Sequence, residues 1–228
     1  MEKIDAENSI IVINKPPKLS SHEVSALVKR MLGASRSGHA GTLDPEVSGV
    51  LVVALGRATK LLRFLIAKDK TYVGIIKFHE ILERKAIEQL FQKFEGEITQ
   101  TPPKESAVRK VARRRKIHYL KFLEQSRENP RLALFEAKVD AGTYIRTLCD
   151  DMGKLCGGAR MEELRRIASG NVTESEAYTL QQLGDALWLA KEKGDDSALK
   201  KMLRKPEEFI DFPRVVIKQS ALGSGTRR

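Results

Sequence analysis

Ser37-Gly-His-Ala-Gly-Thr-Leu-Asp-Pro-Glu-Val-Ser-Gly49 is the segment from which the fold of this chain can be worked out. Asp44 lies among three glycines in it and is followed directly by Pro45. Glycine adopts backbone conformations that other residues avoid, and proline pushes the residue before it out of the α region. We therefore expect Asp44 on a stiff, irregular loop that holds its carboxylate at one angle.

An uninterrupted apolar run, residues 50–55, follows this loop and predicts a buried strand. Binding and catalytic side chains concentrate on loops that a rigid scaffold holds. On spacing alone, a plain turn in which Asp44 caps neighbouring amides is favoured over catalysis, because aspartate is common in turns. A phosphate-binding loop is excluded, since His39 stands where that motif requires lysine.

The composition is that of a globular protein with a polyanionic partner. The 228 residues suffice for one large domain, or for one domain and a fragment. The net charge of +11 favours nucleic acid or another anionic surface. Cys149 and Cys156 lack the spacing of a zinc site or a disulfide framework, so reduced thiols are expected. With no signal-peptide core and no membrane-length apolar run, we expect a soluble intracellular protein.

Helix and strand patterns run through the chain. Ser20 and Glu23 match a capping box and begin a helix that ends at Gly33. Residues 161–170 are ambiguous between helix and strand. The other expected strands cover residues 10–13, 71–79, 132–139 and 212–217, and the other expected helices cover residues 58–66, 83–94, 144–155 and 179–193.

The densest charge lies between residues 104 and 121, where eight lysines and arginines face one acid, Glu105. A charged run is often only a solvated face. Here the charge is too one-sided for internal pairing, so a surface that faces phosphates is the better prediction. Apolar residues within the run favour an ordered strand and loop over a tail.

Further short motifs follow one another along the chain. Residues 70–72 read Lys-Thr-Tyr, residues 142–146 read Gly-Thr-Tyr-Ile-Arg, and residues 164–170 read Leu-Arg-Arg-Ile-Ala-Ser-Gly. Together with residues 38–45 they resemble the TruB/dyskerin family of RNA pseudouridine synthases over most of residues 10–220. The pieces that are most similar to the archaeal and eukaryotic branch, the catalytic subunit of H/ACA guide-RNA particles, are residues 21–24, 42–43, 56–61 and 143–153.

The resemblance implies roles that the residues alone do not. Asp44 would attack the target uridine, Arg146 would pair with Asp44, Tyr72 would stack on the target base, and His39 would help to hold the flipped nucleotide. Without the resemblance, Tyr72 is a core aromatic and Arg146 a surface ion-pair partner. The residues expected to bind substrate are Leu164, which is otherwise a core leucine, and Lys15, Arg113, Arg114, Arg115 and Lys116.

The resemblance also implies the architecture. We expect an α+β pseudouridine-synthase fold with a mixed, mostly antiparallel central sheet flanked by helices. The catalytic domain is expected over residues 1–205. Residues 206–228 resemble a linker and the start of a truncated C-terminal PUA domain, an RNA-binding module that is mostly missing.

The implied function is isomerisation of specific uridines to pseudouridine in rRNA, with tRNA as a further substrate. The implied partners are the RNA substrate, an H/ACA guide RNA and the small H/ACA accessory proteins. Two alternatives stay open: a guide-independent synthase that acts on the tRNA T-loop, and a non-catalytic RNA-binding scaffold. No metal or organic cofactor is expected, and no membrane. The expected location is the cytoplasm, or the nucleolus if the source is eukaryotic.

Overall fold

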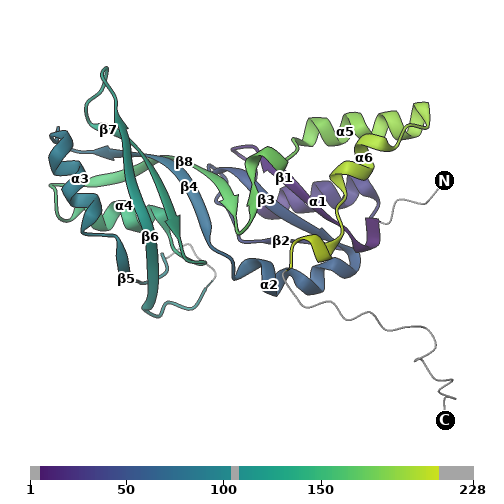
Figure 1. Ribbon diagram of the computed structural model, residues 1–228, viewed down its shortest axis with the longest axis horizontal. Coiled ribbons are helices and arrows are strands. Elements are labelled where there is room, and N and C mark those ends of the chain that lie inside the picture. Colours follow the sequence, from purple (N-terminus) through teal and green to yellow (C-terminus); the bar gives the residue numbers. More distant parts are fainter. Residues whose placement is uncertain (1–5, 104–107, 211–228) are drawn as a thin grey trace, which may run out of the picture.

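The computed structural model describes residues 6–103 and 108–210, which form one mixed sheet covered by helices (Figure 1). The strands are β1 (Ile10–Lys15), β2 (Ser37–Ala40), β3 (Ser48–Leu55), β4 (Lys70–Phe78), β5 (Gly96–Gln100), β6 (Arg113–Gln125), β7 (Leu132–Val139), β8 (Ala159–Ser169) and β9 (Val172–Thr173). Their order is β1-β3-β8-β4-β7-β6-β5, with β2 paired to β3 and β9 to β8. The β3–β8 pair is parallel and the other pairs are antiparallel, so the predicted fold class is confirmed.

Helices cover the sheet in two groups (Figure 1). The α-helices are α1 (Ser21–Leu32), α2 (Leu62–Ile66), α3 (Arg84–Gln92), α4 (Ile145–Gly153), α5 (Leu180–Trp188) and α6 (Ser197–Met202). Short 3₁₀ turns lie at Ala6–Asn8, Gly56–Leu61, Glu174–Glu176 and Pro206–Glu208, and a π turn at Leu189–Lys193. Helices α1, α5 and α6 lie over the half of the sheet that contains β1 and β3, and α3 and α4 lie over the other half. None of the described helices is both long and apolar enough to span a bilayer.

Each half of the sheet has its own apolar core. In β1, Ile11 and Ile13 face α1 and α5, whereas Ile10 and Val12 pack on the opposite face with α2 and the Gly56–Leu61 turn. Burial on both faces explains why β1 and β3 read as uninterrupted apolar runs. In the other half, the sheet and helices α3 and α4 enclose a cluster that includes Phe78, Phe91, Phe135 and Leu148.

Most of the expected elements are present, with adjustments at their ends. The capping box is formed: Ser20 Oγ accepts from the Glu23 amide, and the Glu23 carboxylate accepts from the Ser20 amide. The expected helix 58–66 is instead a 3₁₀ turn followed by α2, and helix 179–193 is α5 followed by the π turn. The sequence patterns did not indicate β2 and β5. The expected strand 212–217, like the rest of residues 211–228, lies outside the described residues.

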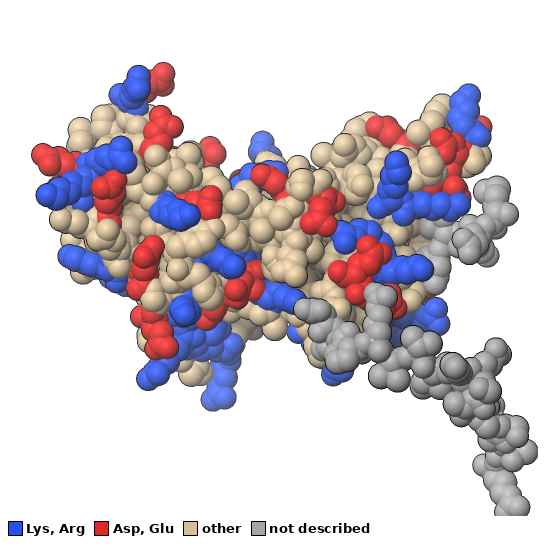
Figure 2. Space-filling view, viewed as in Figure 1, with Lys and Arg blue, Asp and Glu red and all other residues tan. Residues whose placement is uncertain are grey.

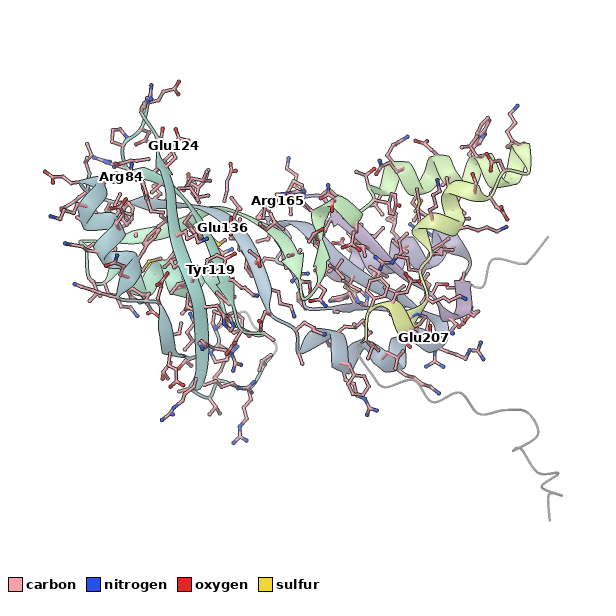
Figure 3. All side chains as sticks on the ribbon, viewed as in Figure 1. Arg84, Tyr119, Glu124, Glu136, Arg165 and Glu207 are labelled. Atoms are coloured by element: carbon pink, nitrogen blue, oxygen red, sulfur yellow. The ribbon has the colours of Figure 1, made fainter. Side chains whose placement is uncertain are left out.

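The ambiguous segment 161–170 is strand β8, and it joins the two halves. It pairs antiparallel with β4 and, over two residues, parallel with β3. Arg165 reinforces this junction (Figure 3): its guanidinium donates to the Asn14 side chain at 3.2 Å and to the Ser48 hydroxyl at 3.4 Å. Pairing partners on both sides favour the strand over the helix that the same residues could form.

Candidate active site

Asp44 and Arg146 meet although 102 residues separate them in the sequence. Asp44 lies in the loop between β2 and β3, which we call the Asp44 loop (residues 41–47), and Arg146 lies in the first turn of α4. Arg146 Nη2 is 3.5 Å from Asp44 Oδ2, and the two side chains are 49% and 59% exposed. An ion pair this open to water contributes little to stability. At 3.5 Å the contact is at the long limit of a hydrogen bond, and it places the Arg146 guanidinium beside the Asp44 carboxylate.

Ser21, the first residue of α1, holds the backbone directly before Asp44. Its buried hydroxyl donates to the Leu43 carbonyl at 2.9 Å and accepts from the Leu43 amide at 2.7 Å. On the other side of Asp44, the Lys18 amide donates to the Pro45 carbonyl at 2.8 Å. Ser21 belongs to the motif at residues 21–24, but no local pattern indicated this contact with Leu43.

Lys15, at the end of β1, also holds the Asp44 loop. Its buried ammonium donates to the carbonyls of Pro16, Leu19 and Pro45, the last at 3.0 Å. Burial lowers the pKa of Lys15, and the nearby carboxylates of Glu46 and Asp44 oppose that shift. In the structure the Lys15 ammonium is buried and holds protein carbonyls of the Asp44 loop, and the predicted contact of Lys15 with substrate stays a prediction.

Arg166 and Lys70 are two further buried cations behind the Asp44 loop. The Arg166 guanidinium donates to the carbonyls of Val50 at 2.8 Å and Gly41 at 2.9 Å. Lys70 donates to the Ile66 carbonyl at 2.8 Å. Burial, followed by repulsion from Arg166, lowers the pKa of Lys70 to about 8. Both residues belong to the motifs at residues 70–72 and 164–170, but no role was predicted for either, because the burial of a cation leaves no periodic signal in the sequence.

Tyr72 and Leu164 lie in the core beside the Asp44 loop. The Tyr72 ring, on β4, is 8% exposed and packs in the same cluster as Leu43 and Val47, which flank Asp44. Leu164, on β8, is half-buried against this cluster. Both residues therefore fit the plain core interpretation. Their predicted contacts with a target base remain predictions.

His39, on β2, stands at the start of the Asp44 loop. Its Nε2 lies 3.4 Å from the Thr42 hydroxyl. Burial first, and then the charges of His22 and Arg166, lower the pKa of His39. A neutral imidazole at this position can donate one hydrogen bond and accept another.

The basic strand β6 carries the predicted phosphate-binding residues. Arg113, Arg114 and Lys116 are exposed, and Figure 2 shows Lys and Arg side chains gathered at the end of the molecule where β5 and β6 lie. Arg115 is half-buried, and its guanidinium lies against Gly142 so closely that a Cβ there would be 3.1 Å from Nη2. Arg115 therefore connects β6 to the turn that precedes Arg146.

A cavity and a group of potential metal ligands are formed by other residues of the described chain. A cavity of about 470 Å³ is lined by residues that include Val52, Leu65, Arg204 and Phe209, and by none of the predicted site residues. Within the described part of the chain, potential metal ligands converge at Asp69, His118 and Asp140. Asp44 itself is open to solvent, so an extended polymer can reach it.

Comparison with known proteins identifies the family. A model described as "TruB family pseudouridylate synthase (N terminal domain)" matches residues 29–145. The chain belongs to the TruB family. A model described as "tRNA pseudouridylate synthase B C-terminal domain" matches residues 146–210 of this TruB chain. The family predicted from the motifs is confirmed.

Curated relatives and solved structures cover the TruB chain almost completely. A "Probable tRNA pseudouridine synthase B" of Pyrobaculum aerophilum is 44% identical over 216 residues, which cover 94% of this chain and 64% of the relative. The protein of the same name from Archaeoglobus fulgidus is 43% identical, covering 93% and 65%. The chain thus spans just under two thirds of the length of these TruB relatives.

Two solved structures share the fold. The crystal structure of a Cbf5-Nop10-Gar1 complex contains a chain that is 41% identical with a TM-score of 0.86, covering 91% of this chain and 63% of that one. A structure of an H/ACA RNP bound to a substrate RNA containing 2'-deoxyuridine contains a chain that is 39% identical with a TM-score of 0.81, covering 90% and 61%.

Proposed function

We propose that this chain isomerises uridine to pseudouridine in RNA. The observation that supports the proposal most directly is the Asp44–Arg146 contact, which unites two motifs of the TruB family across 102 residues. The loop that carries Asp44 is braced by Ser21, Lys15 and Arg166, so the carboxylate is held in position before any substrate arrives. Such preorganisation is what a catalytic group requires.

In the proposed reaction, the target uridine leaves its stack and enters the space at Asp44, at a cost of about a few kcal/mol. Contacts between β6 and RNA phosphates offset that cost. Asp44 acts as the covalent catalyst or base while Arg146 keeps it aimed. The glycosidic bond between C1′ and N1 breaks, the base rotates, and a bond between C1′ and C5 forms. C5 then loses its proton and N1 gains one, so the overall change is an isomerisation. His39, Tyr72 and Leu164 would surround the base.

We further propose that the chain works with a guide RNA and small accessory proteins. Two observations bear on this choice and point in different directions. The similar solved chains come from a Cbf5-Nop10-Gar1 complex and from an H/ACA RNP. The curated relatives, in contrast, carry the name tRNA pseudouridine synthase B, which supports the guide-independent alternative.

The deciding measurement is pseudouridine formation, detected by carbodiimide modification and primer extension. One reaction contains a guide RNA, the accessory proteins and a matching rRNA fragment, and the other contains tRNA alone. Product only in the first supports guide dependence, and product in the second supports the stand-alone enzyme.

The matched variants are Asp44→Asn and Glu46→Gln, which each neutralise one exposed carboxylate of the same loop region. We expect Asp44→Asn to abolish product while RNA affinity stays within about threefold, a change of under 1 kcal/mol. Glu46→Gln should keep most of the activity. If the unmodified chain binds RNA but gives no product in either reaction, the enzymatic proposal is contradicted and the non-catalytic scaffold alternative is supported.

A further inference from the structure

Three side chains with metal-binding chemistry converge where β4 begins, β7 ends and β6 contains a bulge. Asp69 directly precedes β4, and Asp140 directly follows β7. The antiparallel register pairs Lys70 with Val139, so the two aspartates lie next to each other at one edge of the sheet. One ligand atom from each of Asp69, His118 and Asp140 lies within 4.8 Å of the others.

His118 reaches this point because β6 contains a bulge there. Ile117 pairs with Val139 and Tyr119 with Lys138, so His118 is left as an extra residue without a partner on β7. Bulges of this kind re-aim a side chain. The next residue, Tyr119, anchors the strand by donating a hydrogen bond of 2.6 Å to Glu136, and Figure 3 shows both side chains on adjacent strands.

One ring nitrogen of His118 contacts the carboxylates of both Asp69 and Asp140. His118 Nε2 is 3.0 Å from Asp140 Oδ1 and 3.5 Å from Asp69 Oδ2. One nitrogen carries at most one proton, and 3.5 Å is too long for a good hydrogen bond, so a proton satisfies only one of the two contacts well. A divalent cation would satisfy both carboxylates and the imidazole together.

We propose that Asp69, His118 and Asp140 bind a first-row divalent metal ion of the Zn²⁺ type. Imidazole nitrogen and carboxylate oxygen are both zinc ligands. Bonds of about 2.0–2.2 Å in a tetrahedron place neighbouring ligand atoms roughly 3.3–3.6 Å apart. The 3.5 Å separation between His118 and Asp69 lies in this range, and the 3.0 Å separation between His118 and Asp140 is slightly shorter, as expected for a hydrogen bond that the metal would replace.

The surroundings fit a metal site with open positions. The Lys116 amide donates to Asp140 Oδ2 at 2.9 Å, which fixes that carboxylate and leaves Oδ1 directed at His118. Outer hydrogen bonds of this kind orient metal ligands. The three side chains are 29–40% exposed, so an ion can enter and water can complete its shell. The bound ion would clamp the basic strand β6 to β4 and β7.

The test uses the full chain without a histidine tag, freed of metal by dialysis against EDTA. Zn²⁺ is then added and followed by isothermal titration calorimetry and by metal analysis after equilibrium dialysis. We expect one Zn²⁺ per chain and a higher melting temperature. His118→Gln should lose stoichiometric binding, and Asp69→Asn should bind at least tenfold more weakly.

The control variant is His79→Gln, which removes an exposed histidine just past the opposite end of β4 and should bind Zn²⁺ as the unmodified chain does. Co²⁺ in place of Zn²⁺ should give visible absorption bands that His118→Gln lacks. If His118→Gln fails to fold, the Zn²⁺ affinity of Asp69→Asn tests the proposal, because asparagine has nearly the same size and shape as aspartate. Absence of one-to-one binding, or equal binding by the Asp69 and His79 variants, overturns the proposal.

Discussion

At the scale of single residues, we expect Arg146 to affect the position of the Asp44 carboxylate more than the stability of the fold. Both side chains are about half exposed, so losing their ion pair should change the free energy of unfolding by less than about 1 kcal/mol. We expect Arg146→Lys to lower kcat/KM at least about 100-fold, roughly 3 kcal/mol, because lysine cannot present the same planar donors.

The control for this prediction is Arg160→Lys, which changes an arginine of similar exposure in another surface pair, with Glu162 at 3.1 Å. Steady-state kinetics and urea unfolding of both variants measure the two effects separately. Unchanged kinetics for Arg146→Lys would contradict an aiming role.

Lys70 gives a prediction about pH. Its folded-state pKa of about 8 lies below the ordinary value of 10.5, because burial disfavours its charge. Between these values the unfolded chain binds more protons than the folded one, so stability should rise with pH across this window. Relative to Lys70→Met, the unmodified chain should gain about 1–3 kcal/mol from pH 8 to pH 10.5 in urea unfolding. If the difference in free energy of unfolding between the two proteins did not change with pH, the lowered pKa of Lys70 would be refuted.

At the scale of elements, two adjacent serines at the start of α1 have different structural roles. Ser20 caps the helix, whereas Ser21 holds both backbone groups of Leu43. Ser20→Ala should cost about 1 kcal/mol of stability and leave activity unchanged. Ser21→Ala should cost about 1–3 kcal/mol, since two buried backbone groups lose their partner, and should also lower kcat.

Thermal unfolding and kinetics of the two serine variants, made in parallel, separate these effects. Equal loss of activity in Ser20→Ala and Ser21→Ala would mean that α1 supports the loop only through its general stability.

At the scale of the whole molecule, the short parallel pairing of β3 with β8 joins the two halves of the sheet. Gly49 permits it: its φ is +106°, and a Cβ there would lie 2.1 Å from the Arg166 carbonyl oxygen. Gly49→Ala should therefore destabilise the fold by at least about 3 kcal/mol, because backbone must move. Gly33→Ala, with positive φ but open space around it, should cost only about 1 kcal/mol. Similar melting temperatures for the two variants would contradict the proposed requirement for glycine at position 49 in the β3–β8 pairing.

Patterns local in sequence predicted most of the elements, and the family resemblance predicted the principal site pair. The capping box at Ser20 and the apolar run 50–55 are short-range signals, and both appear as expected. The family motifs predicted that Asp44 and Arg146 would meet. The observed ends of two helices differ from the predicted ends. The 3₁₀ and π turns at these ends depend on packing against distant residues, which the sequence of one segment does not reveal.

What the sequence by itself determined is the identity of the groups: one aspartate on a glycine-rich loop, an arginine in a second motif, and a basic strand. Only the tertiary structure decided which cations are buried behind that loop and that Lys15 points at carbonyls. It also decided that residues 161–170 form a strand and that Asp69, His118 and Asp140 converge. The physical reason is that burial, strand register and bulges are set by partners far away in the chain, and no local pattern contains them.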